Sequence, residues 1–287
     1  MRAIKAVSVA TVLFSPIIAH AELQLTPSVS MGYKKVTFGS GGTSPSEVSM
    51  PTLGLGFAAT IDRFSVQANI EHSAQDGRYR EVSGPAFVSS VGSPYTEMVS
   101  TEIYNGDLSR QDISLIFNYL LNDKFAVFAG YLDNVSEMDS LSVSLYDEQG
   151  EEVPITLSFD DGSTDIARLG GSFRQRDYGA LAGIRYIPLA TNFGSLSLTL
   201  GYAILQTDTD LTVSLKSSDF FEKQKIPTSN SDTTGASASI GWVGNIPGVK
   251  SLHYVGSLRA NRFTQKDDVG KTNNDLTYAG VGLLYTL

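Results

Sequence analysis

Few residues of this chain could carry acid–base or nucleophilic chemistry. His72 stands beside Ser73, and a carboxylate-rich segment runs from Asp160 to Asp165. A histidine that met such carboxylates, or a serine, could act as the general base of a hydrolase. The same carboxylates could instead bind calcium, which prefers clustered oxygen ligands. The segment lacks the EF-hand spacing and its closing glutamate, so it fits a solvated acidic loop better, and we predict no metal and no other cofactor.

The elements that carry these residues are predicted to be strands. Ten segments alternate between apolar and other residues with the period of two of a β-strand. We take the apolar set of each segment as its outward face. The outward sets run over residues 29–33, 53–61, 64–70, 113–121, 125–131, 178–186, 196–204, 236–242, 252–260 and 277–287.

This parity keeps the histidines away from the carboxylates. His72 continues the outward set that ends at Ile70, and the adjacent Ser73 faces the other side. His253 is predicted to face inward, but it lies beside a short turn at the opposite end from the acidic loop. We therefore predict no catalytic residues and no enzymatic activity.

The last segment keeps its alternation up to the final residue. Most soluble domains fray at their termini, whereas lipid allows no unpaired strand edge, so a membrane barrel closes its last strand against its first. The spacing Gly282-x-x-Tyr285-x-Leu287 resembles the C-terminal targeting signal of Gram-negative outer-membrane β-barrel proteins, with Leu287 where that family often has Phe or Trp. The resemblance implies a transmembrane antiparallel up-and-down β-barrel, which the barrel-assembly machinery recognises through this strand.

The beginning of the chain is typical of an exported protein. Arg2 and Lys5 precede a short apolar stretch, and Ala19-His20-Ala21 fits a signal-peptidase cleavage site. We expect a signal peptide over residues 1–21, followed by a single barrel domain over residues 22–287 in the cell outer membrane. The chain has no cysteine, which excludes disulfides. Its 30 acidic residues outnumber its 21 basic ones, which disfavours nucleic acid as a partner.

The connections between the ten segments fall into two kinds. Short turns are predicted at residues 62–63, 122–123, 188–194 and 244–249, and long polar connections at 39–49, 75–109, 134–175, 208–233 and 264–274. Bacterial barrels have short periplasmic turns and long extracellular loops. Residues 141–159 also alternate and could add two strands, giving twelve. Each arm is short and Pro154 removes a ladder donor, so we predict a hairpin outside the membrane and ten strands. Residues 211–215 suggest that the seventh strand also continues beyond the bilayer.

Inverting the parity gives the residues that face the lumen, and most of them are small. The charged exceptions are Lys34, Glu71, Arg110, Asp112, Asp177, Arg185 and Arg259. Buried charges are costly unless they are paired, so these residues could form a salt-bridged plug or a filter for solutes. About eight strands make a barrel that side chains just fill, whereas open aqueous channels have 16 to 18 strands. Ten strands favour the plug.

Four outward cations are predicted to lie near the outer edge of the membrane. They are Lys35, Arg174, Arg176 and Arg262, which could bind lipid phosphates or simply be solvated. We therefore predict a structural or surface-interacting barrel with a largely plugged lumen. Its partners would be outer-membrane lipid, lipopolysaccharide and an unspecified external molecule. The alternative is a narrow, porin-like passive channel for small solutes.

Overall fold

The computed structural model describes residues 23–38, 46–75, 80–89, 96–104, 108–146, 152–153, 155–158, 164–217, 221–249, 251–266 and 271–287. The predicted signal peptide and residues 159–163 of the acidic loop lie outside these ranges. Among the described residues, no helix is long and apolar enough to cross a membrane.

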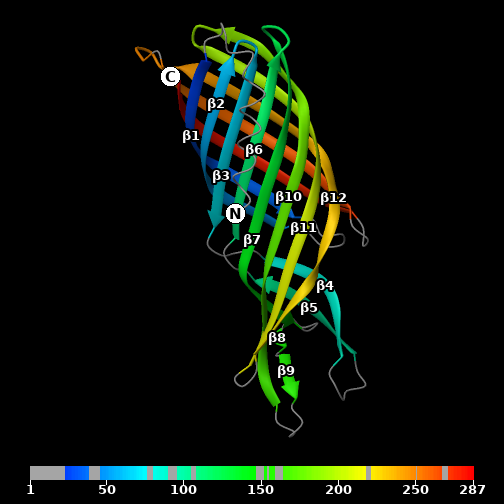
Figure 1. Ribbon diagram of the computed structural model, residues 1–287. Helices are drawn as coiled ribbons and strands as arrows, with labels where there is room; N and C mark the ends of the chain where they lie inside the picture. The colour runs from blue at the N-terminus through cyan, green and yellow to red at the C-terminus, as the bar shows by residue number, and fades with distance from the viewer. Residues whose placement is uncertain are drawn as a thin grey trace, which may run out of the picture.

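Ten strands close into an antiparallel barrel (Figure 1). In ring order they are β1 (Leu23–Phe38), β2 (Ser46–Ile61), β3 (Phe64–Gln75), β6 (Leu108–Leu120), β7 (Phe125–Tyr146), β10 (Thr164–Thr191), β11 (Gly194–Lys216), β12 (Phe221–Asn245), β13 (Leu252–Lys266) and β14 (Lys271–Tyr285). The last strand closes the ring against the first, with Leu283 opposite Val29. The predicted fold, its strand number and its closure are therefore confirmed.

Tight turns join the strands at one end of the barrel, which we call the turn end, and the opposite end is the loop end. Asp62 adopts a left-handed conformation, with φ of 49°, in the β2–β3 turn. In the β6–β7 turn the Asn122 side chain accepts hydrogen bonds from the backbone of Lys124 and Phe125, at 2.9 and 3.0 Å. Such local bonds let Asx residues replace a backbone partner where the chain reverses.

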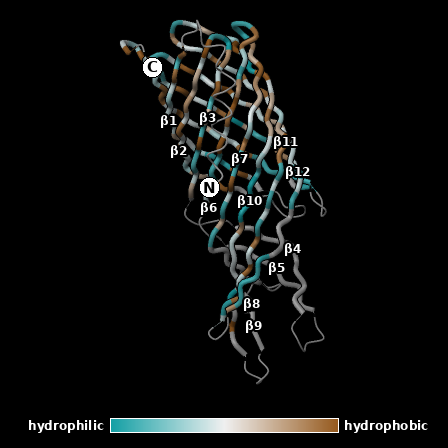
Figure 2. Tube along the Cα trace, in the orientation of Figure 1, coloured by the Kyte–Doolittle hydropathy of each residue, from teal (hydrophilic) through white to brown (hydrophobic). Residues whose placement is uncertain are grey.

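Side-chain exposure follows the predicted parity. Leu53 is 68% exposed and Val281 61% exposed on the outer face, whereas Lys34 and Met50 on the inner face are 0% exposed. Figure 2 shows the resulting alternation of apolar and hydrophilic positions along the barrel strands. Ile61 departs from the pattern: it was predicted to face outward, yet it is only 8% exposed. It lies at the β2–β3 turn, in register with Leu23 and Phe64.

Four neighbouring strands continue past the loop end of the others (Figure 1). β7, β10, β11 and β12 have 22, 28, 23 and 25 residues, against 12 to 16 in the other strands of the ring. The predicted continuation of the seventh segment is part of β11. The connection predicted at 208–233 was wrong as a loop, because most of it extends the β11–β12 ladder, with Val213 opposite Gln224.

Four short strands add to this extension. β4 (Arg80–Ser89) pairs with β5 (Thr96–Tyr104), and β5 pairs with the end of β7. The connection at 75–109 was predicted as a long polar stretch, and the structure forms β4 and β5 within it. The Gly84-Pro85 step hides the alternation of β4, because the register shifts between Ser83 and Ala86.

The alternating segment 141–159 adds no strand to the ring. Its first arm is the end of β7, and its second arm contains β8 (Glu152–Val153), which pairs with β7, and β9 (Ile155–Ser158), which pairs with β10. Both short strands lie in the extension (Figure 1). The barrel therefore has ten strands and not twelve.

Candidate functional site

An apolar cluster fills the lumen near the loop end. We call it the apolar layer; its buried members, each 0% to 5% exposed, are Val36, Val48, Met50, Leu108, Met138, Leu276 and Tyr278, and Phe173 packs against them. They come from strands on opposite walls, so the layer crosses the barrel. From the sequence, a lumen of small and charged residues was expected, so this layer was not predicted. Its signal was present, since inward positions near the loop ends of β1, β2, β6 and β14 are large and apolar.

A network of ion pairs lies directly on the turn side of the apolar layer. At its centre, the fully buried Lys34 ammonium is 3.1 Å from Glu71 Oε2 and also pairs with Asp112. Each carboxylate holds an arginine as well, with Arg259 Nη2 2.8 Å from Glu71 Oε2 and Arg110 Nε 2.8 Å from Asp112 Oδ1. The structure thus brings together five of the seven predicted lumen charges.

The network ties the walls of the barrel to one another. Its members come from β1, β3, β6 and β13, and Arg110 Nη1 also donates to Ser136 Oγ of β7 at 3.0 Å. The Tyr278 ring joins the network to the apolar layer, because the guanidinium of Arg259 lies 5.2 Å and the ammonium of Lys34 6.0 Å from its centroid. Cations at this distance from an aromatic ring are attracted to it. Ionic and apolar contacts therefore lie next to each other inside the barrel.

Asp177, also predicted for the lumen, stands outside the network. Its Oδ1 accepts hydrogen bonds from Thr207 Oγ1 at 2.7 Å and Gln175 Nε2 at 3.0 Å. Thr207 in turn bonds to Thr233 at 2.7 Å. These hydroxyls could not be predicted from the sequence, because buried threonines have no distinctive spacing.

Arg185, the seventh predicted lumen charge, makes no ion pair or hydrogen bond with any described residue, and its Nε is buried. It borders a lumen cavity of about 200 Å³. On β3 and β6 this cavity lies on the turn side of the ion pairs, where Gln67, Asn69 and Ser114 line it. Phe128 and Leu181 provide part of its apolar wall.

The outward cations face carboxylates on neighbouring strands. Arg176 makes two hydrogen bonds to Asp133, at 2.8 and 2.6 Å. Arg174 Nε is 3.0 Å from Glu137, and Arg262 Nε is 3.8 Å from Asp275. The fourth, Lys35, is exposed on β1. The three arginines therefore reach the surface as ion pairs rather than as free charges.

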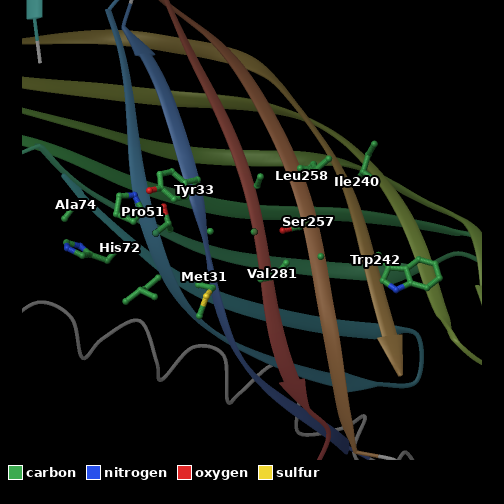
Figure 3. Close-up of a pocket in the computed structure, with 16 residues that line it drawn as sticks. Met31, Tyr33, Pro51, His72, Ala74, Ile240, Trp242, Ser257, Leu258 and Val281 are labelled. Carbon is green, nitrogen blue, oxygen red and sulfur yellow. The ribbon is translucent and has the colours of Figure 1, made fainter. Parts of the chain in front are cut away.

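His72 and His253 occupy separate surfaces. The His72 side chain is exposed on the outer wall, at one end of an apolar groove of about 1030 Å³ (Figure 3). Figure 3 shows Pro51 and Ala74 near it, with Trp242 at the far end. His253 Nδ1 lies 2.9 Å from Asn245 Oδ1 close to the turn end. In the part of the chain that the structure describes, no three His, Asp or Glu residues are grouped to hold a metal ion.

Comparison with known proteins identifies the fold. No family model matches the sequence, and no curated protein does. The outer-membrane protease OmpT from Escherichia coli superimposes with a TM-score of 0.50, over 92% of this chain and 96% of that one, at 13% identity. This chain has the fold of an outer-membrane β-barrel protein.

Other outer-membrane barrels match less well. The P. putida toluene transporter TodX has a TM-score of 0.36, at 13% identity over 92% of this chain and 89% of its own. The attachment invasion locus protein Ail of Yersinia pestis has a TM-score of 0.29, at 13% identity over 91% of this chain and 98% of its own. At 13% identity, the likeness to OmpT extends to the fold and not to a function.

Proposed function

We propose that this protein is a non-catalytic barrel of the outer membrane that is closed to solutes and presents its β-sheet extension as an interaction surface. The observation that carries the proposal is the lumen itself, where the apolar layer and the ion-pair network occupy one section. An ion crossing that section would have to separate Lys34 from two carboxylates in a confined space, which is costly. A barrel of ten strands also lies near the narrow end of the range, where side chains fill the interior.

The proposed surface role rests on the strands that extend beyond the barrel ring. β7, β10, β11 and β12 continue past the ring, and β4, β5, β8 and β9 attach to them (Figure 1). With the usual orientation of bacterial barrels, this part lies outside the cell and the short turns lie in the periplasm. We propose that an external molecule binds there, that Lys35 and the paired arginines contact lipid or lipopolysaccharide phosphates, and that the assembly machinery recognises β14.

The histidine positions support the absence of catalysis. The His72 side chain lies on the outer wall, on the opposite face of the sheet from the lumen carboxylates Glu71 and Asp112. His253 is bonded to an asparagine at the turn end. A general base must lie within hydrogen-bond reach of the group it activates, and among the described residues neither His72 nor His253 is bonded to a serine or threonine hydroxyl.

Single-channel recording in planar bilayers tests the closed lumen. We expect the purified protein to show no steady conductance. Met50→Ala, which removes a fully buried side chain from the apolar layer, should produce transient openings. Met31→Ala, a matched change on the outer face, should not. A steady conductance of the unaltered protein would overturn the proposal.

A narrow passive channel for small solutes is the second candidate. The lumen cavity favours it, because space and polar groups are already present on the turn side of the network. This function requires that the apolar layer opens, and the same recordings would show it as steady conductance in the unaltered protein.

A further inference from the structure

Two arginines and two hydroxyls form a row across four strands of the inner wall. In the strand register, Arg185 of β10 is opposite Thr199 of β11, Thr199 is opposite Ser239 of β12, and Ser239 is opposite Arg259 of β13. Neighbouring strands are about 4.8 Å apart, so the four side chains stand side by side. All four line the lumen cavity. We call them the arginine row.

The donors of the arginine row are largely unused. Arg185 bonds to no described residue, and its Nε is buried. Arg259 gives Nη2 to Glu71, but its own buried Nε has no partner. The hydroxyls of Thr199 and Ser239 make no side-chain hydrogen bond within the described residues. Buried polar groups in native proteins are nearly always bonded, so the buried Nε atoms of Arg185 and Arg259 call for an acceptor, and the two half-buried hydroxyls stand beside them.

The charges around the cavity are also unbalanced. Arg110, Arg185 and Arg259 line it together with only two carboxylates, Glu71 and Asp112. Both carboxylates are engaged with Arg110, Arg259 and the neighbouring Lys34. The guanidinium of Arg185 is therefore the cation without a counter-charge, and an unpaired charge away from bulk water is costly.

We propose that the arginine row binds a small oxyanion, such as phosphate or a short-chain carboxylate, inside the lumen cavity. The planar guanidinium of Arg185 can donate two parallel hydrogen bonds to such an anion, and Arg259 Nε and the two hydroxyls can donate the others. A water molecule has a share of about 30 Å³ in the liquid, so a cavity of about 200 Å³ holds a small oxyanion together with a few waters. The proposal does not depend on whether the lumen conducts.

The anion would enter from the turn end, because the apolar layer closes the other side. Inward positions between the cavity and the short turns include the small residues Ser28, Gly56, Ser197, Gly241 and Gly282. Because these side chains are small and uncharged, we expect the anion to reach Arg185 from this end.

Isothermal titration of the purified full-length protein in non-ionic detergent tests the proposal, with inorganic phosphate and acetate as two separate probes at constant ionic strength. We expect saturable binding of at least one probe. If only one of the two binds, that probe identifies the class of anion that the arginine row accepts. Arg185→Gln should weaken that binding at least about tenfold, because it removes a charged donor pair. Arg63→Gln, which changes an exposed arginine of the β2–β3 turn, should bind as the unaltered protein does.

A second pair of variants guards against misfolding of Arg185→Gln. Thr199→Val and Ser239→Ala keep every charge, and each should weaken anion binding a few-fold. The bound anion should also raise the melting temperature of the unaltered protein more than it raises that of either variant. The proposal is overturned if neither probe binds saturably, if Arg185→Gln binds as tightly as the unaltered protein, or if both hydroxyl variants leave the affinity unchanged.

Discussion

The variant Asp112→Asn tests whether the buried ion pairs contribute more to the stability of the barrel than exposed ion pairs do. The substitution keeps the shape of the side chain and removes one of the two carboxylates that serve Lys34, Arg110 and Arg259. Lys34 is fully buried and the Arg110 side chain is 8% exposed, so neither cation can turn to water. Three cations would then share Glu71 alone.

The expected loss in the free energy of unfolding depends on which charges remain without a partner. Removing one partner of a buried ion pair typically costs about 3–5 kcal/mol, because the other charge stays buried. Arg110 keeps its bond to Ser136, and Lys34 keeps Glu71, so we expect about 3 kcal/mol, at the lower end of that range. The free energy of unfolding would be measured by urea titration of the protein refolded into lipid vesicles.

Asp133→Asn is the matched control. It breaks the pair with Arg176, whose side chain is 45% exposed, and exposed pairs contribute about 0–1 kcal/mol. Adding Lys34→Met to Asp112→Asn should restore part of the loss, since it removes the excess cation. If Asp112→Asn were no more destabilising than Asp133→Asn, the network would not hold the barrel together as argued.

Three further predictions concern the two faces of the wall and the network. Ala180→Arg, on the outer face, should cost about 2–4 kcal/mol in vesicles, and an equal cost for Leu181→Arg would contradict the assignment of the faces. Gly183→Ala should cost about 1–3 kcal/mol, because its new methyl group would collide with a backbone oxygen of β11. Gly256→Ala, where the methyl group meets nothing within 4 Å, should melt like the unaltered protein. Arg259→Ala should lower the melting temperature without producing steady conductance, whereas a cation-selective conductance with unchanged melting would indicate a filter instead of a plug.

The ring could be predicted from the sequence because each barrel strand has one apolar and one non-apolar face. Period-two alternation reports those faces directly, and the turn residues Asp62 and Asn122 mark where the strands reverse. β4 escaped notice because its Gly84-Pro85 step interrupts the alternation at a register shift. Short strands outside the ring lack the constraint of an apolar face, so their pattern is weaker.

The sequence predicts which side chains face the lumen, but not how far along the barrel axis each of them lies. Parity shows that Asp177 and Arg185 both point inward, yet they are eight residues apart on β10, about 26 Å along the strand. They therefore cannot belong to one layer. Which residues meet across the barrel depends on the stagger between strands, and this follows from register, which no single strand encodes. Lys34 and Asp112 meet for that reason despite lying 78 residues apart in the chain.

The 28 residues of β10 form one strand of about 90 Å from the turn end of the barrel to the tip of the extension, with a register shift against β7 between Gly171 and Phe173 and one against β11 between Tyr186 and Leu189. Ladders to β7 and β11 brace it on both sides for most of that length. A molecule bound at the tip would be held by a stiff, hydrogen-bonded sheet instead of a flexible linker, and so at a fixed distance from the bilayer. Pulling on that tip would load the backbone hydrogen bonds of several strands in shear at once, a geometry in which many bonds must break together before the attachment yields.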